Sequence, residues 1–229
     1  MPATKTTLIV GASPDLVEMA RHLGRDSEWI GLLSRTEAKL RPLKERLTSR
    51  DITAEYFVGD VTEMVSVQDA FEKVAEWSPQ LDRMIYNVGT ISHEAASEIT
   101  SRGIHKVMSP NFFGFVNCFQ LGLPLLRRSG ESHVITISSV HALEEVQPVA
   151  YAASKAALRI YIAALRRELQ RERIRISEVY LGQKQNANGW RDLVCEEIVE
   201  GLLQVLKERP ERHLIGQATD LTHQPQKGG

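Results

Sequence analysis

The chain has 229 residues, of which 42% are hydrophobic and 25% are charged, enough to bury the core of one globular domain. Its 28 Lys and Arg and 29 Asp and Glu leave a formal net charge of −1 without blocks of like charge, which argues against nucleic acid and membrane surfaces as partners. The sequence has no run of about 18 apolar residues and no signal-like N-terminus, so we expect a cytoplasmic protein.

The two cysteines do not indicate a metal or redox site. Cys118 and Cys195 stand alone, without the spacing of a metal-ligand pair or a disulfide framework. We interpret both as small buried apolar side chains and expect no bound metal ion.

Short apolar, β-branched runs alternate with longer helical patterns along the chain. Strands are predicted over residues 6–11, 27–34, 52–59, 82–89, 132–139, 174–181 and 212–217. Between them, apolar residues recur with the period of a helix, most clearly over 36–47, 62–77, 151–170 and 196–208. This alternation predicts a doubly wound α/β fold, in which helices cover both faces of one parallel sheet of about seven strands. Residues 1–220 are expected to form this Rossmann-like domain, and residues 221–229 a polar tail.

In such a sheet a ligand lies beyond the carboxyl ends of the strands. The residues at these ends are, in chain order, Gly11, then Ser34 and Arg35, then Asp60 and Val61, then Asn87 to Gly89, then Ser138 and Ser139. Tyr151 and Lys155 follow in the next helix, where a spacing of four residues places both on one face. We therefore expect these polar residues to gather at one edge of the sheet.

Five motifs, GASPDLV, GDVT, YNVG, ISSV and YAASK, occur in an order and at intervals that resemble the short-chain dehydrogenase/reductase family over nearly the whole chain. A Tyr-x-x-x-Lys pair alone arises often by chance, so the resemblance depends on the ordered set. It implies an enzyme that interconverts a carbonyl and an alcohol by hydride transfer with a nicotinamide cofactor. By position it implies Tyr151 as general acid/base and Lys155 as the residue that lowers the tyrosine pKa and binds the nicotinamide ribose. It also implies that Ser139 orients the substrate carbonyl and that Asn111 holds a proton-relay water.

Two of these assignments leave alternatives open. Ser138 matches the family by its distance to Tyr151, whereas the interval back to Asn111 and the Val that follows favour Ser139. Asn111 comes directly after Pro110, and a proline inside a helix removes one hydrogen bond and commonly kinks the backbone. The carbonyl freed at that kink could hold the relay water, or the kink could serve packing alone.

The end of the second strand bears on the choice of cofactor. Where relatives that use NAD usually carry an acid, this chain has Ser34 and Arg35, and a guanidinium suits the 2′-phosphate of NADP by charge and geometry. NADP(H) is therefore favoured over NAD(H), with a solvated surface Arg35 as the alternative. The resemblance further implies cofactor contacts from five positions, namely Asp60, Val61, Asn87, Gly89 and Gly182.

The first turn departs most from the family. When the family pattern TGxxxGxG is aligned on Gly11, Val10 stands in place of its threonine, Asp15 in place of its second glycine and Val17 in place of its third. The missing glycines let the backbone approach a pyrophosphate at the helix N-terminus. Gly11 and Ser13 remain the expected cofactor contacts in this turn, with Ser13 also predicted to cap the helix. A carboxylate about 4 Å from a phosphate would cost roughly 1 to 4 kcal/mol, so binding requires Asp15 to turn away or the cofactor to shift.

The family's substrate lid also looks shortened, because residues 181–186 lead almost at once to a helix near Asp192. A short lid excludes less water, which indicates either a large substrate in an open cleft or lost catalysis. Residues that could line this region are interpreted first as ordinary loop residues: His93, His141, Glu144, Glu145 and Trp190.

Taken as a set, these features predict an NADP(H)-dependent oxidoreductase that acts on a small-molecule ketone, aldehyde or alcohol, with Tyr151 as acid/base. The alternative is a non-catalytic dinucleotide-sensing or scaffold protein on the same fold. A methyltransferase would also carry a glycine turn, but it would not explain YAASK after ISSV. Because residues 112–126 are apolar on nearly every face, and relatives pair this helix with the one that carries Tyr151, we expect a homodimer or homotetramer.

Overall fold

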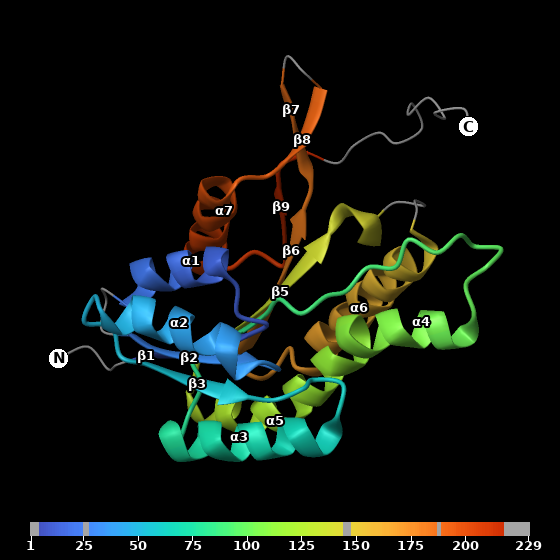
Figure 1. The fold of residues 1–229 in the computed structure, drawn as a ribbon. Helices are drawn as coiled ribbons and strands as arrows, with labels where there is room; N and C mark the ends of the chain where they lie inside the picture. Colours follow the sequence, from blue (N-terminus) through green and yellow to red (C-terminus); the bar gives the residue numbers. More distant parts are fainter. Residues whose placement is uncertain (1–4, 25–27, 144–147, 187–188, 218–229) are drawn as a thin grey trace.

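The computed structural model describes residues 5–24, 28–143, 148–186 and 189–217, and the predicted tail 221–229 lies outside them. Its centre is an all-parallel sheet of seven strands in the order β3-β2-β1-β4-β5-β6-β9 (Figure 1). These strands are β1 Lys5–Val10, β2 Glu28–Ser34, β3 Ala54–Val58, β4 Arg83–Tyr86, β5 Ser132–Ser139, β6 Ile174–Leu181 and β9 Arg212–Ile215. The predicted doubly wound fold is therefore confirmed.

The order of the strands reverses at β1, which pairs with β2 on one side and with β4 on the other. In open α/β sheets the crevice for a ligand forms at such a switch point, beyond the carboxyl ends of the strands. Here the two strands that flank it end at Val10 and Tyr86, so the residues just beyond them, Gly11 and Asn87, lie at the switch point.

Helices cover both faces of the sheet (Figure 1). One face is covered by α1 Pro14–Gly24, α2 Glu37–Thr48 and α7 Cys195–Glu208, and the other by α3 Met64–Trp77, α5 Gly114–Arg128 and α6 Val149–Glu168. Because side chains alternate along a strand, Ile9 packs into the first of these two cores, whereas Leu8 and Val10 pack into the second. Each face is apolar, which is why the strands read as nearly continuous apolar runs.

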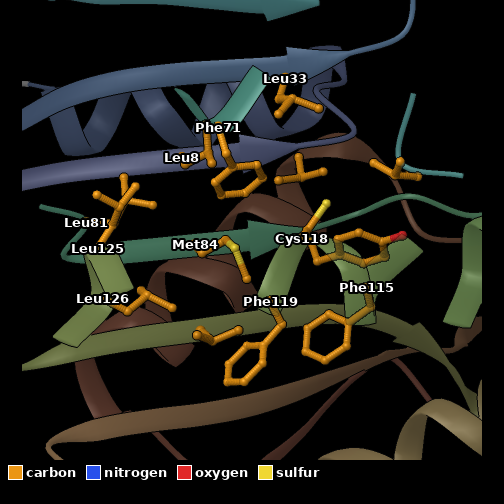
Figure 2. Packing of buried hydrophobic residues seen from close by; sticks show 14 of the residues in the cluster. Leu8, Leu33, Phe71, Leu81, Met84, Phe115, Cys118, Phe119, Leu125 and Leu126 are labelled. Atoms are coloured by element: carbon orange, nitrogen blue, oxygen red, sulfur yellow. The ribbon is translucent and has the colours of Figure 1, made fainter. Parts of the chain in front are cut away.

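The core beneath α3 and α5 is shown in Figure 2. Phe71 of α3 and Phe119 of α5 belong to this cluster, and the Tyr86 and Phe115 rings meet edge to face with centroids 5.5 Å apart. Cys118 is fully buried there, which agrees with the prediction that it is a small buried apolar side chain. Burial raises the pKa of its thiol well above the ordinary range.

Two helical segments precede α5 and were not separated by the sequence pattern. The helix α4 Ser101–Met108 leads into η1 Ser109–Phe113, a single π-helical turn, before the chain continues as α5. Pro110 stands in the first residues of that turn, so the predicted disturbance at this proline takes the form of a π turn.

The segment after β6 differs from the prediction. Within the expected short connection, β7 Gln183–Asn186 and β8 Gly189–Asp192 form an antiparallel two-stranded sheet that projects away from the main sheet (Figure 1). A single β-bridge between Gln183 and Gln217 ties its base to the chain beyond β9, and α7 then begins at Cys195. The sequence offered little sign of this hairpin, because its strands are polar and lack the alternation of a half-buried strand. Among the described helices, none is long and apolar enough to cross a membrane.

Candidate active site

Tyr151 and Lys155 lie in the first two turns of α6, next to the carboxyl end of β5. The stripe of Leu158, Ile162 and Leu165 on the same helix is buried against the sheet and fixes this face inward. Lys155 is 3% exposed, and its Nζ lies 5.7 Å from the centre of the Tyr151 ring. The ammonium donates a hydrogen bond to the Ile137 carbonyl at 3.3 Å, which anchors it at the strand end. The structure thus brings the ammonium beside the tyrosine ring.

Of the two adjacent serines, Ser139 faces this pair. Its hydroxyl hydrogen-bonds to Tyr151, and its Oγ lies 2.8 Å from Nδ1 of His141. Ser138 is buried beside Tyr180 of the neighbouring strand, and its Oγ finds no hydrogen-bond partner within the described chain. The alternation of side chains along β5 therefore directs only the second serine toward Tyr151.

Asn111 occupies the π turn η1 and is fully buried. Its Oδ1 accepts from the Thr90 N–H at 2.7 Å, and its Nδ2 donates to the Thr90 carbonyl at 2.9 Å and to Ser154 Oγ at 2.8 Å. Ser154 in turn donates to the Tyr151 carbonyl at 2.7 Å. The amide therefore holds the loop after β4 against the first turn of α6.

Tyr86, the last residue of β4, holds the other side of η1. Its hydroxyl donates to the Pro110 carbonyl. A Cβ on Gly114 would lie 2.5 Å from that hydroxyl oxygen, so this approach depends on glycine. Tyr86 thus occupies the carbonyl of the proline itself, within the disturbed turn.

The electrostatics of Tyr151 and Lys155 are dominated by burial. Burial raises the pKa of Tyr151, and the hydrogen bond with Ser139 offsets part of this rise. Burial also lowers the pKa of Lys155 to about 8. The sequence led us to expect a lowered tyrosine pKa, and the structure differs because removal from water disfavours the phenolate more than its neighbours stabilise it.

Gly11, Asn87 and Gly89 continue the site along the ends of β1 and β4. Gly11 has a φ of +79°, and a Cβ there would lie 2.8 Å from Val88 Cγ2, so the turn requires glycine. Asn87 Nδ2 donates to the Gly11 carbonyl at 3.1 Å. Gly89 is exposed, and a Cβ on it would lie 3.5 Å from Lys155 Nζ. These three residues connect the first turn to the lysine.

The first turn of α1 shows how the missing glycines are replaced. Ser13 Oγ accepts from the Leu16 N–H at 3.4 Å, in the manner of an N-cap. Asp15 hydrogen-bonds through its carboxylate to the thiol of Cys195 at the start of α7, which raises the pKa of that thiol to about 11. Val17 is fully buried in the core beneath α1. Cys195 packs against the apolar core as expected, but it is only partly buried and its thiol has a polar partner, so its interpretation as a buried residue was wrong.

Arg35, Asp60 and Val61 lie at the ends of β2 and β3. The Arg35 side chain is 72% exposed, and its Nη1 lies 3.8 Å from Asp60 Oδ2. The other carboxylate oxygen of Asp60 accepts from the N–H and hydroxyl of Thr62 at 2.9 and 2.8 Å, which fixes the acid in place. Val61 is buried, and its carbonyl accepts from Asn117 Nδ2 at 3.0 Å.

Ser34 and Gly182 make backbone contacts within the fold. The Ser34 carbonyl accepts from the Gly59 N–H at 3.0 Å, which joins the ends of β2 and β3. The Gly182 N–H donates to the Ile215 carbonyl at 2.9 Å, and a Cβ on Gly182 would meet the Gln217 backbone. Close packing against the chain after β9 thus explains the glycine at 182.

A sequence profile described as short chain dehydrogenase matches residues 5–188. The chain belongs to the short-chain dehydrogenase/reductase family. The fatty acyl-CoA reductase of Acinetobacter baylyi is 27% identical to it over 181 residues, which cover 77% of this chain and 61% of that protein. The chain thus spans less than two thirds of that relative.

Solved structures show the same fold. An alcohol dehydrogenase from the archaeon Thermococcus sibiricus, complexed with 5-hydroxy-NADP, superposes with a TM-score of 0.82 at 20% identity, covering 98% of this chain and all of that one. An NADH-dependent reductase complexed with NAD superposes with a TM-score of 0.78 at 24% identity, covering 87% of each chain. The resemblance stated from the motifs is confirmed at the level of the family and the fold.

Three polar residues of this short-chain dehydrogenase/reductase site were missed or discounted by the sequence analysis: Thr90, His141 and Ser154. Ser154 lies inside YAASK and Thr90 directly after YNVG, so both stood beside motifs that had been noticed. His141 had been interpreted as an ordinary loop residue, although it follows ISSV directly. Of the other loop residues weighed with it, Glu144 and Glu145 lie outside the described chain.

Proposed function

We propose that this protein is an NADP(H)-dependent oxidoreductase that interconverts a ketone or aldehyde and an alcohol, with Tyr151 as the acid/base. The observation that carries the proposal is the convergence of Ser139, Tyr151 and Lys155 at the end of β5. A surface Lys would have no reason to be buried beside a tyrosine ring and bonded to the end of β5. The assignment of the acid/base role rests on this convergence together with membership of the family.

In the reducing direction, a bound nicotinamide would supply the hydride that reaches the carbonyl carbon. Tyr151 donates its phenolic proton to the carbonyl oxygen as negative charge develops there, and Ser139 donates a hydrogen bond to the same oxygen. The raised pKa of Tyr151 keeps that proton in place before the reaction. The phenolate left behind takes a proton from the ammonium of Lys155, whose pKa of about 8 suits this transfer near neutral pH.

The cofactor site would run from Arg35 past Gly11 and Gly89 to Lys155. These residues fit a dinucleotide, because Gly11 forms a tight turn with positive φ before α1 and Gly89 is exposed beside the lysine. Arg35 supports NADP(H) over NAD(H), since its exposed guanidinium is available to pair with a 2′-phosphate. Asp60 competes for that guanidinium at only 3.8 Å, so we expect a preference and not an absolute requirement.

A second candidate is a non-catalytic dinucleotide-sensing or scaffold protein. The replacement of two glycines by Asp15 and Val17 favours it, because both add side chains where a pyrophosphate would approach. Against it, Asp15 is hydrogen-bonded to Cys195 and Val17 belongs to the core, so neither needs to occupy the phosphate site. The complete catalytic set makes the enzyme our first proposal.

Calorimetric titration with NADPH and NADH separates the two candidates, followed by an assay of NADPH oxidation with 4-nitrobenzaldehyde as the carbonyl probe. If the protein is the enzyme, we expect micromolar NADPH binding, weaker NADH binding and turnover that Tyr151→Phe abolishes. Binding without turnover on any of a panel of aldehydes and ketones would favour the sensing protein. Binding of neither cofactor would contradict both the enzyme and the dinucleotide sensor.

We further propose that the protein is cytoplasmic and assembles as a homodimer or homotetramer through η1, α5 and α6. Phe113 and Ile160 support this surface, since their side chains are 45% and 59% exposed on these elements. Sedimentation equilibrium tests the assembly, and a strictly monomeric protein at micromolar concentration would contradict it.

A further inference from the structure

We propose that His141 is a positioning residue of this site, which sets the direction in which the Ser139 hydroxyl donates its single hydrogen. The inference rests on the proposed function and adds to it a residue that the family motifs do not include. His141 touches both Ser139 and Tyr151, which makes it the link between the two side chains that would meet the reacting oxygen.

The turn η2 Val140–Ala142 creates this link. Ser139 caps the turn and accepts a hydrogen bond from the backbone N–H of His141 at 3.4 Å, while Nδ1 of the same residue lies 2.8 Å from the serine oxygen. The imidazole also meets the Tyr151 ring edge to face, with centroids 5.5 Å apart and an angle of 72° between the planes. From α6, Arg159 Nε donates to the Ala142 carbonyl at 3.0 Å and holds the turn in place.

The chemistry follows from the inventory of donors and acceptors. A serine hydroxyl has one hydrogen and two lone pairs, whereas an imidazole nitrogen either donates or accepts, depending on whether it carries hydrogen. If Nδ1 carried no hydrogen, it would accept a hydrogen bond from the Ser139 hydroxyl, and the serine oxygen could then only accept a hydrogen bond from a substrate alcohol. If Nδ1 carries hydrogen, the serine oxygen accepts from it, and the Ser139 hydrogen is free to point at a carbonyl oxygen.

The second arrangement is the one that supports reduction. With hydrogen on Nδ1, both Ser139 and Tyr151 present donors to the same carbonyl oxygen, as stabilisation of developing negative charge requires. The edge-to-face contact keeps the imidazole plane and the phenol in a fixed relation, so the two donors converge. His141 acts through Ser139 and contacts no reacting atom itself.

Substitutions separate this role from simple packing. His141→Phe keeps an aromatic ring beside Tyr151 but removes Nδ1, while His141→Asn places an amide nitrogen near the position of Nδ1. For NADPH-dependent reduction of 4-nitrobenzaldehyde, we expect His141→Phe to lower kcat about three- to tenfold, the effect of one neutral hydrogen bond, and His141→Asn to restore most of it. NADPH affinity should stay within about twofold of the wild type in both variants, since Ser139 and Tyr151, the two side chains that His141 meets, would face the carbonyl substrate.

A double-mutant cycle with Ser139→Ala tests whether His141 acts through the serine. We expect His141→Phe to have no further effect on kcat once Ser139 is alanine. An equal loss in both backgrounds would overturn the proposal, because a packing role does not need the hydroxyl. His22→Phe is the matched control, since His22 is an exposed histidine at the far end of α1, and it should leave kcat unchanged.

A spectroscopic measurement tests the pair without turnover. In protein labelled with ¹⁵N at histidine and free of cofactor, the His141 Nδ1 resonance should have the shift of a protonated ring nitrogen, and Ser139→Ala should move it. A bare-nitrogen shift, or a signal indifferent to Ser139→Ala, would overturn the proposal. If the signal behaves as expected while no carbonyl is reduced, the oxidoreductase proposal fails and the Ser139–His141 hydrogen bond stands.

Discussion

The carboxylate of Asp15 in the first turn of α1 hydrogen-bonds to the thiol of Cys195 in the first turn of α7. Asp15 stands where the family has its second glycine, so its charge was expected to oppose a bound pyrophosphate. The hydrogen bond gives that charge another partner. The same contact raises the pKa of the Cys195 thiol to about 11, because an adjacent carboxylate disfavours the thiolate.

The first prediction concerns the reactivity of this thiol. Asp15→Asn removes the negative charge, so the pKa of Cys195 should fall toward its ordinary value and the thiolate fraction should rise. Alkylation by iodoacetamide at mildly alkaline pH should become about tenfold faster or more. Mass spectrometry locates the modified cysteine, and Cys195→Ser in the Asp15→Asn background should abolish the fast phase. An unchanged rate would show that Asp15 does not control this thiol.

The second prediction concerns cofactor affinity. Because the Asp15 carboxylate has a partner on α7, Asp15→Gly should tighten NADPH binding by less than the tenfold or more that direct opposition to a phosphate would give. Calorimetry at low ionic strength measures the change, and repetition at high salt shows how much of it is electrostatic. A gain above tenfold that disappears with salt would mean that the carboxylate still faces the phosphate.

Tyr151→Phe removes the hydroxyl that we assign as acid/base while keeping the ring that packs beside His141. We expect at least a hundredfold loss of kcat, the usual lower range for a general acid, with NADPH affinity nearly unchanged. Steady-state kinetics and calorimetry measure the two quantities separately. Retained turnover would show that another group protonates the substrate.

Arg35→Ala tests the recognition of the 2′-phosphate. The guanidinium lies at the end of β2 and is mostly exposed, so its removal should disturb the fold little. We expect NADPH to bind about tenfold more weakly and NADH to change by less than about twofold, since only NADPH carries the additional phosphate. Arg50→Ala, a change at an exposed arginine just beyond α2, is the control. Equal weakening of both cofactors would exclude a specific contact with the phosphate.

From the lowered pKa of His133 we expect the folding stability to depend on pH, independently of the active site. His133 is buried at the start of β5, where its Nε2 pairs with Ser177 Oγ at 2.8 Å, and burial is the first cause that lowers its pKa from 6.5 to about 3. Below pH 6.5 His133 therefore becomes protonated in the unfolded chain, whereas it stays neutral in the folded protein until the pH approaches 3. The stability contributed by neutral His133 is complete above pH 6.5 and is lost as the pH falls toward 3, by about 1.4 kcal/mol per pH unit.

Urea denaturation of the wild type and of His133→Gln at about pH 7 and about pH 5 measures this effect. The glutamine amide can keep the contact with Ser177 but does not titrate. The wild type should lose more stability on acidification than the variant does. Equal losses would mean that other groups determine the acid sensitivity.

The sequence predicted the parallel sheet and the meeting of Ser139, Tyr151 and Lys155 at the end of β5 because both depend on local patterns. The strands end within one or two residues of the predicted positions at Val10, Ser34, Val58, Ser139 and Leu181, since their apolar runs stop abruptly at Gly, Ser or polar residues. Lys155 was expected at the end of β5 because it lies four residues after Tyr151, on the same face of the helix, and it is found there.

The features that escaped prediction depend on contacts between distant segments. Asp15 and Cys195 meet only because α1 and α7 share one face of the sheet, and no local pattern encodes that meeting. The hairpin β7–β8 has polar strands without the alternation that marks a half-buried strand. The raised pKa of Tyr151 reflects burial by several elements, which spacing along one helix cannot reveal.

Because of the π turn η1, the site depends on the number of residues between α4 and α5. A π turn holds one residue more than an α turn, and here that extra residue lies in the segment that buries Asn111. Deleting one residue, such as Phe113 with its 45% exposed side chain, would allow α4 and α5 to join as a regular helix. The helices α4 and α5 would keep their orientation, because a π turn accommodates one extra residue within itself, so the change would be confined to the turn that holds Asn111. A scan of point substitutions cannot detect this dependence, whereas a scan of single-residue deletions and insertions would find it at once.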